Sequence, residues 1–305
     1  MRRRHIALLA APVVAVGLCA MLPLMLDPYG LGIALNLLTW IALAESWAMF
    51  SGLSGYISLG HAVFYGAGAY VTVLLWQVVP LWLAIPLSGL AAGLLALALG
   101  WPCLRVRGPY FVILTLGVSE FVKYIVISSE AALGRNGRLL IGTPSLAVLF
   151  ESMLAVAIIS MIVLYVVRSS RLGAGLLAIR EDEVAAEAVG VNAAALKLVT
   201  FTLSALIPGV VGGLMILRST YFEPLQAFNP TTSFTIVTIA ILGGSDEVAG
   251  PFLGAVLLVL ISELLWVRAP EVYMIILGVL LIGFVLFVPE GLLGRAQRLL
   301  TPAKS

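Results

Sequence analysis

Residues 146–167 read LAVLFESMLAVAIISMIVLYVV, and this run contains a single charged side chain, Glu151. An apolar run of about 18 or more residues is long enough to cross a bilayer as a helix. The whole chain shares this character, because 62% of its 305 residues are hydrophobic and only 10% are charged. A soluble domain has about 25% charged residues. The alternation of a membrane β-barrel is missing, so the sequence predicts an all-α, polytopic integral membrane protein.

Similar apolar runs recur along the chain and predict about ten membrane segments within a single membrane domain, residues 1–305. The runs cover residues 6–26, 31–50, 62–79, 81–101, 109–129, 146–167, 195–217, 233–244, 250–267 and 271–288. The run at 233–244 is short for a full crossing and indicates a half-helix or a re-entrant element. The first run also fits a signal peptide, but it continues past Cys19 to Leu26, so we favour an uncleaved first helix.

The distribution of basic residues predicts the orientation of these segments. If the N-terminus is cytoplasmic, ten crossings place most lysines and arginines on the cytoplasmic side, as the positive-inside rule expects. Both termini are then cytoplasmic. The polar loop at about 130–145 is external, and the longer loop at about 168–195 is cytoplasmic.

The loop at about 168–195 contains the stretch LLAIREDEVAAEAVGVN, residues 176–192. Its helix formers predict one short helix that ends near Gly190. A surface helix that binds anionic lipid should be basic, but this one has four acidic residues and one arginine. We therefore favour a helix that docks on another protein over a helix that rests on the membrane surface.

No catalytic, nucleotide-binding or metal-binding pattern is present. The chain lacks G-x-x-x-x-G-K-[ST], HExxH, GxSxG and CxxC, and Cys19 and Cys103 suggest neither a disulfide framework nor a metal cluster. An enzyme acting on lipids would need clustered polar residues at one membrane interface. His61 has no carboxylate or cysteine at ligand spacing, and such a histidine is more often a packing or hydrogen-bonding residue than a ligand. We therefore expect a transport protein rather than an enzyme, with no cofactor bound by this chain.

Glu45, Glu120, Lys123 and Glu263 lie within or near the ends of the apolar runs. A charge at the bilayer centre costs about 2.5–3.5 kcal/mol on insertion scales, so each of these residues is expected to have a partner or a function. Glu120 and Lys123 are three positions apart and are expected to pair on one helix face. Glu45 and Glu263 have no partner nearby in the sequence, which leaves a polar path, an interhelical hydrogen bond or an edge position open. The acids also leave open a stand-alone secondary transporter driven by an ion gradient.

The stretch SGLSGYISLGHAVFYGAGAY, residues 51–70, is rich in glycine, and its first part, 51–60, breaks the apolar pattern. A second glycine-rich break lies at 243–250. Small residues let membrane helices approach closely, whereas transporters often place their paths at broken helices. Both interpretations stay open. The candidates for a translocation path or for helix packing are Ser58, Gly60, His61, Tyr65, Gly66, Gly68, Glu45 and Glu263.

Four blocks of this sequence resemble the branched-chain amino acid ABC transporter permease family, LivM-type subunit. They are SGLSGYISLGHAVFYGAGAY (51–70), RGPYFVILTLGVSE (107–120), AIREDEVAAEAVGVNAAALKLVTFTLSALIPGVVGGL (178–214) and ILGGSDEVAGPFLGA (241–255). The blocks occur in the family's order and between them span nearly the whole chain.

The resemblance implies that the helix in the cytoplasmic loop couples this chain to a separate ATPase. By this resemblance, the coupling residues are Arg180, Glu181, Glu183, Ala185, Ala186 and Gly190. The broader importer signature is Glu-Ala-Ala, three residues, then Gly. Ala185, Ala186 and Gly190 fit it, but Val184 stands at the glutamate position and Glu183 lies one place earlier.

The resemblance also implies partners, a substrate class and a location. The partners are a second related permease subunit, two cytoplasmic ATPase subunits that hold ATP and Mg, and an external solute-binding protein. The solute is expected to be a branched-chain or other amino acid, with urea or a short amide as the alternative. The location is the bacterial plasma (inner) membrane.

Overall fold

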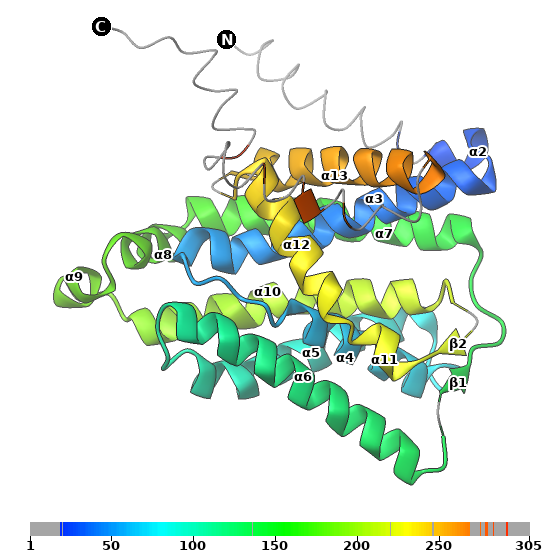
Figure 1. Ribbon diagram of the computed structural model, residues 1–305, viewed down its shortest axis with the longest axis horizontal. Coiled ribbons are helices and arrows are strands. Elements are labelled where there is room, and N and C mark those ends of the chain that lie inside the picture. Colours follow the sequence, from blue (N-terminus) through cyan, green and yellow to red (C-terminus); the bar gives the residue numbers. More distant parts are fainter. Residues whose placement is uncertain are drawn as a thin grey trace, which may run out of the picture.

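The computed structural model describes residues 21–135, 137–219, 221–245 and 247–268, together with Cys19 and five isolated positions further along. Figure 1 shows a bundle of long helices, most of which run along the longest axis of the molecule. The helices are α2 (Leu22–Met25), α3 (Pro28–Trp47), the π-helix η1 (Ala48–Gly52), α4 (His61–Leu75), α5 (Leu81–Cys103), α6 (Pro109–Ala132), α7 (Leu146–Ser169), α8 (Arg171–Glu181), α9 (Glu183–Ala188), α10 (Ala193–Ile216), α11 (Pro224–Ala227), α12 (Pro230–Gly243) and α13 (Ala249–Arg268). The strands are β1 (Arg138–Leu139) and β2 (Tyr221–Phe222).

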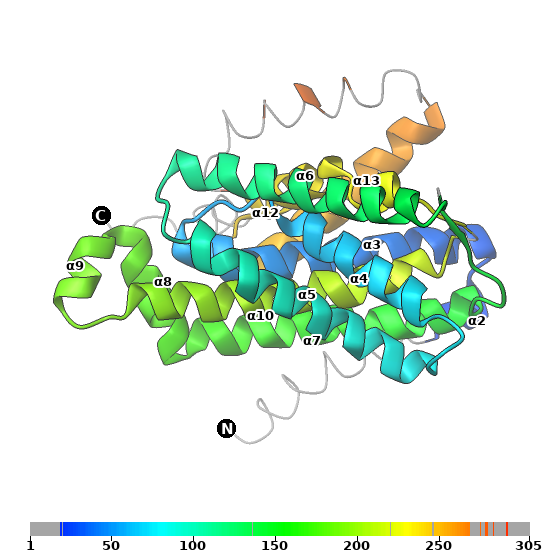
Figure 2. The same cartoon turned by 90° about the horizontal axis from the view of Figure 1, so that it is seen from below.

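Helix α10 lies at the centre of the bundle, where it packs against α4 and α5 on one side and against α3 and α7 on the other. Helix α3 in turn packs against α7, α12 and α13. The view in Figure 2 shows the same arrangement from below, with α6 along one outer side. The core is therefore built around α3 and α10, the two spanning helices with the largest buried share.

Glycines bring α4 and α10 into backbone contact. A Cβ atom added at Gly68 of α4 would lie 1.9 Å from the carbonyl oxygen of Gly209, and one at Gly212 of α10 would lie 2.0 Å from that of Tyr65. Neither position has room for a methyl group, so these helices approach as closely as backbones allow. Within the predicted run 195–217, Gly212 therefore faces α4, whereas Gly209 faces α5, where its Cβ would lie 2.4 Å from that of Ala92.

Residues 55–60 return into the bundle instead of ending at its surface. Helix α3 continues through η1 to Gly52, and the chain then runs back beside α3, where the Trp47 indole donates to the carbonyl oxygen of Ser58 at 2.9 Å. The amide of Leu59 donates to the Thr115 hydroxyl of α6 at 3.1 Å. Helix α4 therefore begins inside the bundle, at the buried His61, and has only 15 residues.

The two ends of the bundle differ. Helices α8 and α9 project at one end, and β1 and β2 pair antiparallel at the other (Figure 1). Next to this sheet, the buried Glu130 accepts two hydrogen bonds from Arg138, at 3.0 and 2.6 Å, and one from Tyr70 at 2.7 Å. The polar loops at about 130–145 and 168–195 thus lie at opposite ends, as their predicted topology requires.

The structure confirms a polytopic all-α protein but does not confirm about ten segments. Within the described residues, six helical stretches are long and apolar enough to span a membrane: Pro28–Gly52, Leu81–Cys103, Pro109–Ala132, Leu146–Ser169, Ala193–Ile216 and Pro224–Gly243. Two shorter apolar helices, His61–Leu75 and Ala249–Leu265, accompany them. The predicted segments at 6–26 and 271–288, and both charged termini, lie largely outside the described residues.

Candidate functional site

The candidate site is the projecting end of the bundle, where the loop at about 168–195 folds into two helices. The sequence predicted one helix, and this was wrong, because the chain breaks at Asp182. This residue has extended backbone angles (φ −158°, ψ 109°), and its side chain accepts from the amides of Val184 and Ala185. Such an N-cap competes with continuation of the helix through this residue. Gly190 follows α9 in the left-handed conformation, with φ +93°, close to the predicted stop.

Helix α9 presents most of its side chains to the outside. Ala186 is 4% exposed and packs on the core, whereas Val184 is 65% and Val189 is 82% exposed. The other exposed residues of this segment are Arg180, Glu181, Asp182, Ala185, Glu187, Ala188 and Gly190. Of the predicted coupling residues, only Ala186 is buried and only Glu183 is partly buried.

Glu183 holds α9 to the bundle. Its carboxylate accepts from the ammonium of Lys197 at 2.7 Å and from the hydroxyl of Tyr56, and it forms an ion pair with Arg107 at 3.1 Å. Lys197 is 2% exposed, donates to Tyr56 Oη at 3.1 Å and lies 4.4 Å from the centre of the Tyr56 ring. Glu187 adds a longer contact of 3.9 Å to Arg107.

This cluster ties four parts of the chain together. Glu183 belongs to α9, Lys197 to the first turns of α10, Tyr56 to the re-entering segment 55–60, and Arg107 to the connection between α5 and α6. Burial raises the pKa of the Glu183 carboxyl, but the hydrogen bonds from Lys197 and Tyr56 outweigh it and hold that pKa below its ordinary value of 4.5. Burial, followed by the hydrogen bond to Glu183, raises the pKa of the Tyr56 phenol. Glu183 is therefore a carboxylate and Tyr56 a neutral donor at neutral pH.

A second set of contacts joins the same end to the two glycine-rich breaks. The Arg180 guanidinium donates to the carbonyl oxygen of Gly52 at 3.0 Å. A Cβ atom added at Gly52 would lie 2.6 Å from the carbonyl oxygen of Ser245, so the breaks at 51–60 and 243–250 contact each other. Arg168, in the last turn of α7, reaches Glu247 at 3.6 Å. A movement of α8 and α9 would thus reach both breaks.

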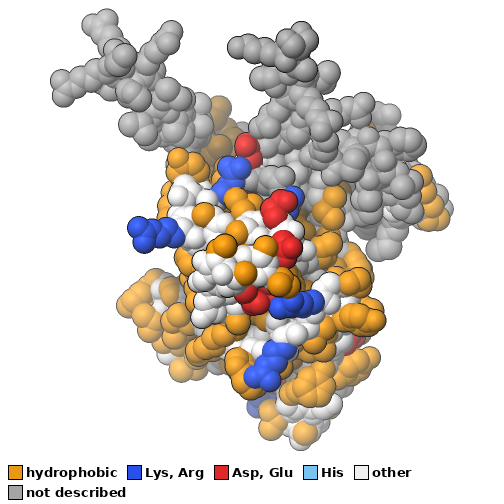
Figure 3. All heavy atoms as spheres, turned by 90° about the vertical axis from the view of Figure 1, so that its left-hand side faces the viewer, with side chains coloured by type: hydrophobic (Ala, Val, Ile, Leu, Met, Phe, Trp, Pro, Cys, Tyr) orange, Lys and Arg blue, Asp and Glu red, His pale blue; other side chains and the backbone are white. Residues whose placement is uncertain are grey.

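Charged side chains gather on this face. Figure 3 looks onto the projecting end and shows acidic and basic groups around small and apolar ones. The basic residues Arg107, Arg168, Arg180 and Lys197 all make their contacts here.

The structure places the candidates from residues 51–70 in tight surroundings. Gly66 packs on the ring of Phe228, where a Cβ atom would lie 2.5 Å from it, and Gly68 contacts α10. Gly60 donates its amide to the Ser58 hydroxyl at 3.2 Å. His61 is fully buried, and neither ring nitrogen has a hydrogen-bond partner within the described part of the chain. Tyr65 is partly buried.

Glu45, Glu120, Lys123 and Glu263 have different surroundings. Lys123 and Glu120 form the predicted ion pair on α6, so that expectation is confirmed. Glu45 is fully buried in α3, and its carboxyl oxygens lack a partner among the described residues. Glu263 of α13 accepts from the hydroxyl of Tyr29. Glu45 and Glu263 lie on different helices, and no contact joins either to the Glu183 cluster among the described residues.

Sequence reasoning missed Tyr56, Arg107 and Lys197 as members of the charged cluster. A signal existed for Lys197, because a lysine near the start of the apolar run 195–217 needs a partner when buried. No comparable signal pointed to Tyr56, which lies 127 positions before Glu183.

Comparisons with known proteins support a single family. Residues 30–285 match the family model described as branched-chain amino acid transport system / permease component. The chain is 30% identical to the high-affinity branched-chain amino acid transport system permease protein LivM of Salmonella typhimurium, over 95% of this chain and 75% of that protein. It is 30% identical to LivM of Escherichia coli K12, over 89% of this chain and 71% of that protein.

A second kind of permease matches more weakly. The LivH protein of Salmonella typhimurium, also named a high-affinity branched-chain amino acid transport system permease, is 25% identical over 85% of this chain and 92% of its own length. No solved structure matches. With a family model covering most of its length and LivM relatives at 30% identity, the chain belongs to the branched-chain amino acid transport system permease family.

Proposed function

We propose that this chain is the membrane-spanning permease subunit of an ABC importer for branched-chain or other amino acids in a bacterial inner membrane. ATP and Mg are held by two separate ATPase subunits, and an external solute-binding protein delivers the solute. The names of the relatives support amino acids over urea or short amides, and support a second, LivH-like permease as the partner within the membrane. The observation that carries the proposal is the anchored, outward-facing helix α9.

Helix α9 has the properties of a docking element. Val184 and Val189 offer exposed apolar side chains at the tip, and Glu181, Asp182 and Glu187 surround them with negative charge. An apolar centre with a charged rim is the usual anatomy of a protein interface. The surface that receives α9 on the ATPase should therefore be an apolar groove with basic residues at its edge.

Helix α9 is firmly attached to the bundle, so a force on it would be transmitted to the membrane helices as by a lever. Glu183 joins it to α10 and to the segment 55–60, and Arg180 joins the adjoining helix to Gly52. When the ATPase subunits close on ATP, a pull on α9 would be passed to α10, which packs on α4 and α5. Alternating access would then follow from tilting these helices against the partner permease. A stand-alone transporter would need no such lever.

Replacing Val189 by aspartate should weaken ATPase docking at least tenfold, because an exposed apolar side chain that the ATPase would cover becomes a charge among other acidic groups. A tenfold loss corresponds to about 1.4 kcal/mol, a modest cost for an interface anchor. Recovery of the ATPase subunit with the purified permease measures it. Val184→Asp should act in the same direction. Ala186 is unsuited to this test, because it is buried within its own chain.

Two matched controls separate docking from folding. Val189→Ile keeps the apolar surface and should retain the ATPase. Leu139→Asp adds the same charge at an exposed apolar position of the opposite end and should also retain it. Recovery of the ATPase with Val189→Asp at the level of Val189→Ile would contradict the docking assignment.

A further inference from the structure

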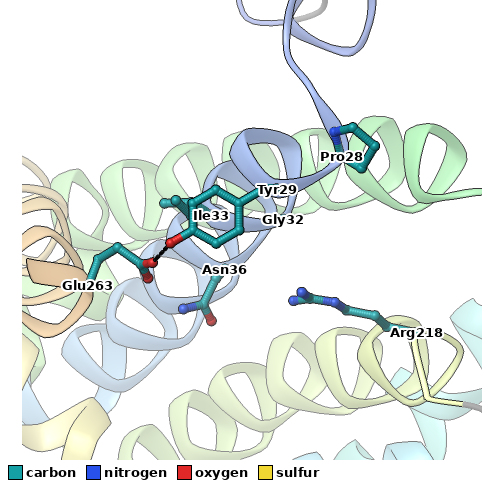
Figure 4. A pocket seen from close by; sticks show the side chains of 7 residues that line it. All are labelled: Pro28, Tyr29, Gly32, Ile33, Asn36, Arg218 and Glu263. Atoms are coloured by element: carbon teal, nitrogen blue, oxygen red, sulfur yellow. Dashed lines mark hydrogen bonds between the residues drawn. The ribbon is translucent and has the colours of Figure 1, made fainter. Parts of the chain in front are cut away.

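A cavity of about 570 Å³ lies at the end of the bundle opposite α9. It opens between the start of α3, the turn after α10, and α13 (Figure 4). Its polar lining comes from Tyr29 and Asn36 of α3, Arg218 after α10 and Glu263 of α13. A volume of about 300–1,000 Å³ is typical of small-molecule sites.

The cavity holds one positive and one negative side chain that do not neutralise each other. Glu263 accepts from the Tyr29 hydroxyl. The Arg218 guanidinium makes no ion pair or hydrogen bond within the described part of the chain. Figure 4 shows it extending toward Asn36, with Glu263 on the other side of that residue. Two opposite charges are thus presented to the same space, one from the turn after α10 and one from α13.

Gly32 allows this arrangement. A Cβ atom added there would lie 3.2 Å from Nη2 of Arg218, closer than most real contacts. The guanidinium therefore rests against the backbone of α3 at Gly32. Ile33 and Pro28 supply apolar surface in the same lining.

We propose that this cavity binds a zwitterion, an aliphatic α-amino acid, on the side where the solute enters. Arg218 pairs with the carboxylate of the amino acid, and Glu263 and Tyr29 bind its ammonium group. The Asn36 amide donates to the carboxylate and accepts from the ammonium group. A ligand with one charge alone would leave the opposite side chain unsatisfied, which is what gives a polar site its specificity. The inference rests on the proposed function and assigns to it a solute-binding site in this subunit.

The experiment measures binding of radiolabelled L-leucine to the purified transporter complex, without the solute-binding protein, in nanodiscs of phosphatidylglycerol alone. Saturable binding should be displaced by unlabelled leucine. It should resist leucinamide, which lacks the carboxylate, and 4-methylpentanoate, which lacks the ammonium group. These analogues test both charges on the unaltered protein. Equal displacement by all three compounds, or no saturable binding, would overturn the proposal.

Variants locate the site. Arg218→Gln and Glu263→Gln should each weaken leucine binding at least tenfold, since each removes one charged partner. Arg135→Gln and Glu151→Gln remove the same charges from other exposed positions and should leave binding unchanged. Unchanged binding in Arg218→Gln and Glu263→Gln would place the solute elsewhere.

The headgroup of phosphatidylethanolamine carries the same two charges, so a second set of nanodiscs contains this lipid. Leucine binding that persists there supports the solute assignment, whereas its loss would assign the cavity to lipid and overturn the proposal. ATP-driven leucine uptake by the full system distinguishes failure of the cavity assignment from failure of the proposed function. Uptake with an unchanged KM in Arg218→Gln rejects the cavity alone, whereas a wild-type system that imports no amino acid rejects the proposed function.

Discussion

Replacing Lys197 by methionine should reduce ATP-driven uptake at least tenfold while the chain still inserts into the membrane. Lys197 is 2% exposed and lies between the carboxylate of Glu183 and the hydroxyl of Tyr56. Removing one partner of a buried ion pair costs about 3–5 kcal/mol, because the other charge stays buried without compensation. Arg107 remains, but its side chain is about half exposed and compensates less. Helix α9 should then lose its firm attachment to α10. Uptake and ATP hydrolysis, measured in the same proteoliposomes, report the result.

Two further variants test whether the charge pair itself matters. Lys197→Arg keeps the positive charge and should retain more uptake than Lys197→Met. Combining Lys197→Met with Glu183→Gln removes both charges and should cost less than the sum of the single changes, since neither is left unpaired. Full uptake in Lys197→Met, or strict additivity in the double variant, would contradict a coupling role for this pair.

Replacing Gly212 by alanine should destabilise the folded protein, although it adds only a single methyl group. This methyl group would lie 2.0 Å from the carbonyl oxygen of Tyr65, and a backbone atom cannot rotate away as a side chain can. Overpacking of a core costs about 1–3 kcal/mol, and α4 would have to move away from α10. The melting temperature in detergent should fall by several degrees. It is measured by size-exclusion chromatography of heated samples.

Gly117 provides the matched control for this prediction. It also lies within a spanning helix, α6, but a Cβ atom there would meet nothing within 4 Å. Gly117→Ala should be neutral or slightly stabilising, because alanine is the better helix former by about 1 kcal/mol. Equal melting temperatures for the two variants would show that the contact between α4 and α10 is looser than its geometry implies.

The sequence predicted the fold class well because hydropathy reports directly on membrane crossing. It predicted the ends of most described long spans within a few residues, as for the run 146–167 and helix α7. The run at 233–244, predicted to be too short for a full crossing, belongs to a longer apolar stretch, Pro224–Gly243. It did not predict how residues 55–60 would pack. Their course depends on distant partners, such as the Thr115 hydroxyl that accepts from Leu59. Helix α4 begins where its apolar run begins, but it ends at Leu75 rather than at residue 79, because Trp76 leaves the helical conformation (φ −58°, ψ 130°).

The candidate site was predicted as a segment but not as a structure. Composition identified the acidic stretch at 181–187 and its outward-facing role. It could not separate the acids by function, because Glu183 turns inward to Lys197 while Glu181 and Asp182 face outward. The break at Asp182 was missed because helix propensity favours continuation, whereas the side-chain cap on the amides of Val184 and Ala185 favours a new start.

Site-specific photo-crosslinking at position 189 tests the central claim most directly. A benzophenone amino acid is placed there, at the exposed apolar position that directly follows α9. The sample is irradiated in membranes of the native host, and the adducts are identified by mass spectrometry. We expect an adduct with a chain that carries a G-x-x-x-x-G-K-[ST] sequence, and no such adduct from position 139 at the opposite end. Adducts with lipid alone, or the same ATPase adduct from both positions, would contradict the assignment of α9 as the docking element of an ABC importer.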